Sequence, residues 1–412
     1  MILVNNQYAI QNIAIEDLCQ QYGTPLYVYD GAKIEEKINL FKASFKGIDF
    51  KIKFACKALT NISILKLMLK NGVDVDVVSI QEAQIALKAG YSPNQIQYTP
   101  SGVAWSEIEE AVALGLHINL DSIPVLEKFG QVYGSSKPVS IRINPYVLEG
   151  GNFKISTAHK DSKFGISYEQ IDQVYELTQK YGIKMVGLHQ HTGSDIKNAS
   201  AILQAADVLF GLAQKYFPDL EMLDLGGGFK VAYKENDHIT DMEEWGKEVV
   251  KAFSDFSEKY GKQIQVWFEP GKFLVSECGF LFVRANVVKH NPSRNFVGVD
   301  SGLNHLIRPM MYDAFHDIIN ISNPSGDETE KYDIVGYICE TDTLGADRTL
   351  PVVKEGDILG IKNAGAYGIT MASNYNSRPR PAEVLIYNGK AHLIRERETL
   401  EDLLKNQIAI EL

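Results

Sequence analysis

One unit recurs eight times along the first two thirds of the chain and constrains its fold more than any other feature. Each unit is a short apolar or β-branched run, a polar break and a segment of helical periodicity. The runs are Ile52–Cys56, Val73–Ser79, Ile96–Pro100, His117–Ser122, Val139–Pro145, Met185–His191, Glu221–Gly228 and Gln265–Gly271. Strands that alternate with helices pair in parallel through right-handed crossovers. We therefore predict an α/β fold with a TIM-like (β/α)8 barrel, with an open doubly wound sheet as the alternative.

Three spacings of serine and a later Glu or Gln predict where helices begin. They are Ser79–Glu82, Ser106–Glu109 and Ser167–Gln170. In a capping box the hydroxyl and the later polar side chain satisfy backbone N–H groups that the first helical turn leaves free. Each spacing therefore predicts a helix that starts directly after the serine.

From Phe273 onward, short strand-like runs follow one another without long helices between them. These runs are Phe280–Val288, Phe296–Val299, Tyr332–Cys339, Ile358–Ile361 and Glu383–Tyr387, and Pro25–Tyr29 alternates in the same way ahead of the barrel. We predict two domains: a barrel over residues 30–272, and a mostly β domain, sandwich-like or barrel-like, formed by residues 1–29 plus 273–412.

Composition limits the partners and the compartment. The 41 Lys and Arg against 52 Asp and Glu give a net charge of -11, which disfavours nucleic acid and anionic membranes. No window approaches a membrane span, and the N-terminal residues lack the pattern of an export signal. The four cysteines are too sparse for a disulfide framework. We expect a cytoplasmic protein with no nucleic-acid partner and no membrane association.

Polar residues gather at the ends of the predicted barrel strands. They are Lys57, Asp76, Asp121, Arg142, His189, His191, Gly226-Gly227-Gly228 and Glu269. Active sites of (β/α)8 barrels lie at this C-terminal face, where the loops after strands seven and eight often hold a phosphate. The three glycines would let backbone N–H groups approach an anion, although a tight turn explains them equally well.

Taken one at a time, these residues leave two interpretations open. Lys57 could be a partly desolvated amine nucleophile or a solvated strand end, and Glu269 could be catalytic or a capping carboxylate. Arg308 could clamp a carboxylate or form a surface ion pair. His189 and His191 stand two apart, so we expect one of them to point into the barrel. No carboxylate spacing completes a metal site, and we expect no metal.

The combination of residue types favours one chemistry. A lysine, a glycine loop for phosphate, a carboxylate, a flat ring and a carboxylate clamp together suit catalysis with pyridoxal 5'-phosphate. The motifs are Phe54-Ala55-Cys56-Lys57-Ala58, His189-x-His191-x-Gly193-Ser194, Leu223-Asp224-Leu225-Gly226-Gly227-Gly228, Glu269-Pro270-Gly271, Leu306-Ile307-Arg308-Pro309-x-x-Tyr312, Cys339-Glu340, Ala364-Gly365-Ala366-Tyr367 and Asn374-Tyr375-Asn376-x-Arg378. Over residues 24–396 they resemble the pyridoxal phosphate enzymes of the alanine-racemase-like fold, fold type III. The resemblance is specific to the diaminopimelate decarboxylases and their ornithine and arginine decarboxylase relatives.

The resemblance implies pyridoxal 5'-phosphate as the cofactor and implies a role for each matching position. Lys57 would bond to the cofactor, His191 would stack on its ring and Glu269 would keep the ring nitrogen protonated. The residues around the phosphate would be Ser194, Gly227, Gly228, Gly271 and Tyr367, with Asp76 and Arg142 orienting the site. Lys272 stands where the family commonly has Arg; it would contact cofactor and substrate, but without the fork of a guanidinium.

The resemblance also implies how a small-molecule amino-acid substrate is held. Arg308 and Tyr312 would bind its distal carboxylate, and Glu340 its distal ammonium, with Lys272 and Tyr367 also lining the substrate site. Cys339 would reprotonate the α-carbon. In the family the Cys339–Glu340 pair reaches the active site of the other subunit, so a homodimer is implied.

These implications define a function and two rivals. We expect a carboxy-lyase that decarboxylates meso-2,6-diaminopimelate to L-lysine and CO2, a step of lysine biosynthesis. Glu340 favours this substrate, because the ornithine decarboxylases tend to have Asp there. The first rival is a decarboxylase of ornithine, lysine or a carboxylated polyamine precursor. The second is a non-catalytic regulator of the same fold, against which the retention of Lys57 and Cys339 speaks.

Overall fold

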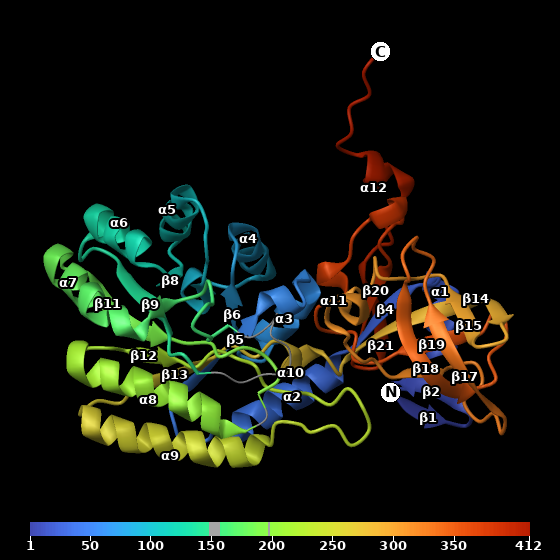
Figure 1. Cartoon of the computed structure of the whole chain (residues 1–412), viewed down its shortest axis with the longest axis horizontal. Helices are drawn as coiled ribbons and strands as arrows, with labels where there is room; N and C mark the ends of the chain where they lie inside the picture. The colour runs from blue at the N-terminus through green and yellow to red at the C-terminus, as the bar shows by residue number, and fades with distance from the viewer. Residues whose placement is uncertain (148–156, 197) are drawn as a thin grey trace. The chain divides into compact units, whose positions relative to one another are not determined.

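The computed structural model describes residues 1–147, 157–196 and 198–412, and the chain divides into two compact units (Figure 1). One unit, called here the barrel unit, comprises Lys37–Val231 and His238–Leu274. The other, the β unit, comprises Met1–Glu36, Ala232–Asp237 and Val275–Leu412. The chain passes from one unit to the other within helices α2 (Gly31–Ser44) and α10 (Lys272–Val275), and the segment Ala232–Asp237 between them belongs to the β unit.

Among the residues that the structure describes, eight parallel strands of the barrel unit close into a ring. In order they are β5 (Phe50–Ala55), β6 (Asp74–Val77), β7 (Ile96–Tyr98), β8 (His117–Leu120), β9 (Pro138–Asn144), β11 (Lys184–His189), β12 (Met222–Asp224) and β13 (Gln265–Phe268). Because β8 pairs with β9 and β13 pairs with β5, the predicted barrel is confirmed and the open sheet is wrong. A short strand, β10 (Ile166–Ser167), pairs with the end of β9.

Helices alternate with these strands and lie on the outside of the ring (Figure 1). They are α3 (Ile62–Lys70), α4 (Ile80–Ala89), α5 (Trp105–Leu114), α6 (Ile123–Tyr133), α7 (Ile171–Tyr181), α8 (Ala199–Tyr216) and α9 (Met242–Tyr260). Their apolar faces are buried; α8, for example, buries Ile202, Ala206 and Leu209. Within the described parts of the chain, no helix is both long enough and apolar enough to cross a membrane.

The three predicted helix starts have different outcomes. The Ser79 hydroxyl accepts from the Glu82 N–H at 3.1 Å, so the first prediction is confirmed. The second is wrong: α5 begins at Trp105, before Ser106, and Ala104 is its N-cap. At the third, Ser167 caps a single 3-10 turn (Tyr168–Gln170), which leads into α7.

A nine-stranded sheet forms the core of the β unit among the described residues. Its strands are β4 (Leu26–Asp30), β14 (Gly279–His290), β15 (Asn295–Val299), β16 (Ile318–Asn320), β17 (Thr329–Val335), β18 (Thr343–Pro351), β19 (Ile358–Ile361), β20 (Ala382–Tyr387) and β21 (Lys390–Arg395). β4 lies between β14 and β20, antiparallel to the first and parallel to the second, and appears in Figure 1 as a blue strand among orange ones. The remaining elements are β1 (Ile2–Val4), β2 (Gln7–Ile10), β3 (Ile13–Ala14), α1 (Ile15–Tyr22), α11 (Arg308–Tyr312) and α12 (Leu400–Leu404).

The predicted strand Tyr332–Cys339 is too long, because β17 ends at Val335. A side chain at Gly336 would place its Cβ 2.0 Å from Asp342 Oδ2, so only glycine fits there. The Asp342 carboxylate accepts from the backbone N–H of Leu303 at 2.7 Å and of Ile338 at 3.1 Å. These bonds turn the chain out of the sheet, and Cys339 lies exposed on the connection between β17 and β18.

Candidate active site

The barrel places the predicted residues of its unit at one end of its strands. Lys57 follows β5 in a 3-10 turn (Cys56–Ala58), Asp76 lies in β6 and Arg142 in β9. His191 follows β11, and Glu269 follows β13. Because all eight strands are parallel, their carboxyl ends form one face of the barrel.

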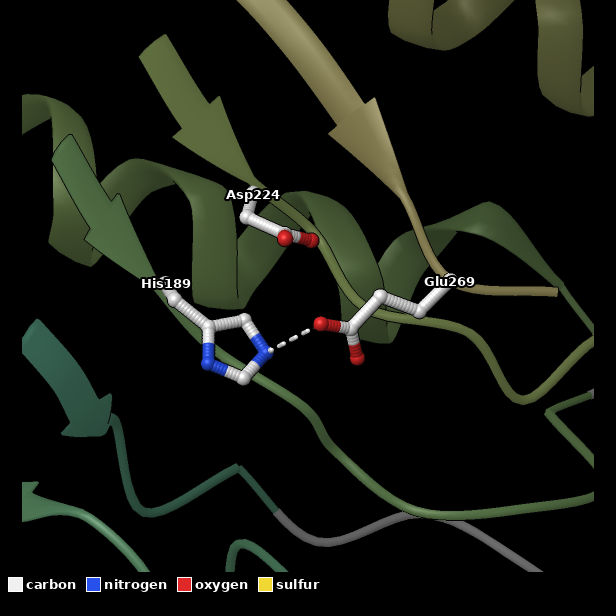
Figure 2. A group of neighbouring side chains, drawn as sticks. All are labelled: His189, Asp224 and Glu269. Atoms are coloured by element: carbon white, nitrogen blue, oxygen red, sulfur yellow. Dashed lines mark ion pairs between the residues drawn. The ribbon is translucent and has the colours of Figure 1, made fainter. Parts of the chain in front are cut away.

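Glu269 is one of three buried carboxyl groups at this face, with 6% of its surface exposed. Its Oε1 lies 3.4 Å from His189 Nε2 (Figure 2). The same oxygen accepts from Gln97 Nε2 at 3.1 Å. Burial opposes the ionised form, but the interactions with His189, His191 and Lys57 outweigh it, so the pKa of Glu269 lies below its ordinary value. Glu269 therefore holds a negative charge inside the barrel.

Two further carboxyl groups near Glu269 keep their protons more readily. Asp224 Oδ2 accepts from the same Gln97 Nε2 at 2.8 Å, and its Oδ1 accepts from the Gly226 N–H at 2.8 Å. Burial and the charge of Glu269 raise the pKa of Asp224 to about 7. The same two causes raise the pKa of Asp76 well above its ordinary value. The charge of the cluster is thus concentrated on Glu269.

His189, Asp224 and Glu269 also form a group whose possible metal-ligand atoms lie within 4.8 Å of one another (Figure 2). Spacing along the chain did not reveal this group, because its members come from three different strand ends. Gln97 Nε2 donates to both carboxylates, so its hydrogens take the space between them that a cation would need. We interpret the group as a hydrogen-bonded cluster, and the expectation of no metal stays a prediction.

The glycine loop packs against His191. The Gly227 N–H donates to His191 Nδ1 at 3.1 Å, and a Cβ on Gly227 would lie 2.1 Å from the Glu269 carbonyl oxygen. Only glycine allows this approach of the two loops. Burial, followed by the charges of Arg142 and Lys57, lowers the pKa of His191 well below its ordinary value. His191 is therefore a neutral, flat ring beside the loop.

Six buried polar atoms at this face have no hydrogen-bond partner among the described residues. They are Asp76 Oδ1, Gln97 Oε1, Arg142 Nη2, His189 Nε2, Gln190 Oε1 and Thr192 Oγ1. A buried polar atom without a partner costs free energy, about 1–3 kcal/mol for a neutral group. Such atoms, grouped near an ionised carboxylate, favour a polar ligand at this end of the barrel.

Lys272 is paired within the barrel unit. Its Nζ lies 2.6 Å from Asp195 Oδ1, and its side chain is buried. Ser194 directly precedes Asp195 on the loop after β11, and Gly271 directly precedes Lys272 after β13. The pair therefore joins two of the loops that the sequence assigns to the phosphate.

The remaining predicted residues belong to the β unit. Arg308 begins α11; it is buried, and its guanidinium lies 5.3 Å from the centre of the Tyr233 ring. Tyr312 ends the same helix, and Tyr367 adopts a left-handed backbone conformation (φ 56°) that is rare outside glycine. A conformation of this kind costs about 1–3 kcal/mol and is typical of functional positions.

Two side chains hold the Cys339–Glu340 pair within the β unit. Asn376 Nδ2 donates to Cys339 Sγ at 3.1 Å, and the Tyr375 hydroxyl donates to Glu340 Oε1 at 2.6 Å. Tyr375 and Asn376 belong to the motif Asn374-Tyr375-Asn376-x-Arg378, but the sequence alone suggested no role for them. Their contacts with Cys339 and Glu340 are thus a structural finding.

Other residues of the site were not found from the sequence. Gln97, Asn119 and Ser140 are fully buried in the barrel and hydrogen-bonded to one another or to predicted residues. Each stands in the middle of an apolar run, where a lone polar residue inside a strand was the only available signal. Asp195 lacked even that signal, since it lies on a loop.

Comparisons with known proteins agree with this geometry. The profile of the family described as "Pyridoxal-dependent decarboxylase, pyridoxal binding domain" matches residues 31–276. The diaminopimelate decarboxylase of Methanothermobacter thermautotrophicus is 37% identical over 399 residues, which cover 95% of this chain and 93% of that protein. That of Vibrio cholerae is 36% identical over 410 residues, covering 97% of this chain and 96% of the relative.

Solved structures give the same result. Diaminopimelate decarboxylase from M. jannaschii superposes with a TM-score of 0.91 at 31% identity, over 99% of this chain and 98% of that one. The enzyme from Helicobacter pylori complexed with L-lysine superposes with a TM-score of 0.87 at 34% identity, over 95% and 98% of the two chains. The resemblance seen in the sequence is confirmed, and the chain belongs to the diaminopimelate decarboxylase family of pyridoxal-dependent decarboxylases.

Proposed function

We propose that the protein decarboxylates meso-2,6-diaminopimelate to L-lysine and CO2 with pyridoxal 5'-phosphate as its cofactor. The observation that carries the proposal is the full-length similarity to diaminopimelate decarboxylases. The structural relative with bound L-lysine agrees with the product. Within the chain, the buried guanidinium of Arg308 supports a substrate with a second carboxylate, because an unpaired buried charge is costly.

The barrel residues suit this cofactor. A phosphorylated pyridine offers acceptors to Arg142 Nη2 and Thr192 Oγ1, whose hydrogens lack partners among the described residues. Its ring nitrogen would meet a carboxylate that is already ionised, Glu269. When bound, pyridoxal phosphate supplies an electron sink for the pair that CO2 leaves on the α-carbon.

Each barrel residue then has a role that its position supports. Lys57, at the end of β5, would hold the cofactor covalently, and the neutral ring of His191 would stack on it. Glu269 would keep the proton on the ring nitrogen, while Asp76 and Arg142 orient these groups. The phosphate would be held by Ser194, Gly227, Gly228 and Gly271 and by Tyr367 of the β unit, with Lys272 adding positive charge.

The residues of the β unit would bind the substrate and complete the reaction. Arg308 and Tyr312 would hold the distal carboxylate, and Glu340 would receive the distal ammonium. Cys339, held by Asn376, would return a proton to the α-carbon after CO2 leaves.

We further propose a cytoplasmic homodimer in which Cys339 and Glu340 enter the active site of the partner subunit. An exposed thiol on a connection that leaves the sheet supports this arrangement. We also propose that the domains divide as residues 30–272 and residues 1–29 plus 273–412.

A CO2-release assay with added pyridoxal phosphate tests the substrate. We expect turnover of meso-diaminopimelate and little or none of lysine or ornithine. Arg308→Ala should weaken kcat/KM for diaminopimelate at least tenfold, since a charge-assisted hydrogen bond is lost. The control is Arg294→Ala, which removes an exposed arginine and should change little. Equal effects of Arg308→Ala on diaminopimelate and ornithine would refute the clamp, and preferred turnover of ornithine would favour the rival.

A further inference from the structure

A row of polar side chains crosses the interior of the barrel and ends at Glu269. His117 Nε2 lies 3.1 Å from Ser140 Oγ, and the Ser140 hydroxyl donates to Asn119 Oδ1 at 3.0 Å. Asn119 Nδ2 lies 2.7 Å from His189 Nδ1, and His189 Nε2 lies 3.4 Å from Glu269 Oε1. Asn119, Ser140 and His189 have no exposed surface, so water does not compete for these contacts.

The contact with Asn119 sets the direction of the row at His189. His189 Nε2 lies 3.4 Å from the Glu269 carboxylate without a hydrogen bond to any described residue, so this contact favours a proton on Nε2 but does not fix it. The other ring nitrogen, Nδ1, faces the amide nitrogen of Asn119, which can only donate. The hydrogen bond with Asn119 therefore requires a lone pair on Nδ1, and the ring's proton then lies on Nε2, toward Glu269.

The amide of Asn119 is held in the orientation that this state needs. Its Oδ1 accepts from the Ser140 hydroxyl, whose oxygen in turn faces His117 Nε2. A rotated amide would turn Oδ1 toward Nδ1 of His189 and demand a second proton on the ring. With the amide as it lies, the hydrogen bonds from Ser140 to Asn119 and from Asn119 to His189 both donate in the direction of Glu269, and such bonds strengthen one another.

We propose that Asn119 is a positioning residue that holds His189 in the tautomer with its proton on Nε2. In this tautomer the ring turns an N–H toward the Glu269 carboxylate and adds no charge beside it. The charge then remains for a cationic ligand group, which under the proposed function is the protonated ring nitrogen of pyridoxal phosphate. This last step rests on the proposed function, whereas the protonation state of His189 does not.

The state of the ring can be observed directly by 15N NMR of protein labelled at histidine. The spectrum is recorded without and with added pyridoxal phosphate, and His189→Gln identifies the signals of His189. We expect an unprotonated Nδ1 and a protonated Nε2 near neutral pH. A proton on Nδ1 alone, or on both nitrogens, would overturn the proposal.

Asn119→Asp tests the role of the amide. A carboxylate at this position and Glu269 would each require a donor from the ring, so we expect His189 to become an imidazolium. Its charge would neutralise Glu269, and the Kd for pyridoxal phosphate should rise about tenfold. A His189 that stays neutral with Nε2 protonated in this variant would overturn the role of Asn119.

A second variant and a control cover the case in which Asn119→Asp does not fold. Asn119→Leu keeps the size but removes the donor, so we expect signals of both ring tautomers; an unchanged spectrum would overturn the proposal. Asn320→Leu makes the same change at an equally buried asparagine of the β unit and should leave the His189 signals as they are. If the unaltered protein shows the expected tautomer but binds no pyridoxal phosphate, the proposed function fails and the assignment of Asn119 stands.

Discussion

At the scale of single residues, the barrel interior separates three carboxyl groups by their protonation. Glu269 is ionised, whereas burial and the nearby charge of Glu269 favour the protonated forms of Asp224 and Asp76. Since the three groups share one buried region, ionising a second carboxyl costs more than ionising the first. The pH dependence of stability should report this cost.

Asp224 has a pKa of about 7 in the folded protein and about 4 in an unfolded chain. Between these values the folded state binds the proton more tightly, so we expect stability to fall as the pH rises from about 4 to about 7. Asp224→Asn cannot ionise and should lose part of that fall, on the order of 1–3 kcal/mol. Urea unfolding of the protein without added cofactor at several pH values measures it.

The control for this experiment is Asp219→Asn, which changes an exposed carboxylate of the same unit. It should retain the full pH dependence of the unaltered protein. Parallel curves for Asp224→Asn and the unaltered protein would contradict the assignment of a raised pKa to Asp224.

The candidate site could be predicted from the sequence where a residue ends a strand, and not where it fills the barrel. Lys57 and Glu269 end apolar runs, so their place on the rim follows from the chain order alone. Asn119 and Gln97 become part of the site only because the ring of strands closes and brings their side chains together. Contacts across a closed barrel join residues that are far apart in the chain, and a single sequence does not reveal them.

At the scale of elements, the connection between β17 and β18 carries the proposed acid, Cys339. Asp342→Ala would leave the backbone N–H groups of Leu303 and Ile338 without their acceptor, at a cost of about 1–3 kcal/mol each. We expect turnover to fall about tenfold, because the connection loosens, while pyridoxal phosphate still binds the barrel. CO2 release and the absorbance of the bound cofactor measure the two effects.

Two further variants sharpen this test. Asp342→Asn keeps one acceptor oxygen and should fall between Asp342→Ala and the unaltered protein. Asp327→Ala, on an exposed loop of the same unit, should be neutral. Normal turnover in Asp342→Ala would show that the carboxylate does not support the position of Cys339.

Strands that are buried on both faces were predicted from the sequence, whereas several short or partly polar strands were not. All eight barrel strands are apolar runs buried on both sides, and all eight were predicted. The strands β16, β18 and β21 were not, because their runs are short or interrupted by polar residues. The prediction at Ser106 was wrong because a serine in the first turn of a helix can precede a Glu by the same three residues as a serine that caps the helix.

At the scale of the whole molecule, the proposed dimer makes a quantitative prediction. Lys57→Ala and Cys339→Ala should each lose most activity, since each removes one of the two groups proposed for every site. In mixed dimers one of the two sites receives Lys57 from one subunit and Cys339 from the other. Random exchange should therefore restore about a quarter of the activity of the unaltered protein.

The control for the mixing experiment combines both substitutions in one chain and mixes that variant with Cys339→Ala. No pairing of these two chains supplies both groups, so activity should stay low. If dimers in the test mixture have exchanged subunits and activity is still not restored, sites shared between subunits are ruled out. Recovery of activity in the control would contradict the shared site as well.

The position of β4 has a consequence for how the chain is made. Residues 26–30 leave the ribosome early, but their neighbours in the sheet, β14 and β20, follow about 250 and 350 residues later. In the meantime the barrel strands between them can pair among themselves. The nascent chain therefore has to keep an apolar strand from aggregating, with two open edges until β14 is synthesised and one until β20 is. A chain truncated before β20 would retain the barrel strands but leave one edge of this early strand unpaired.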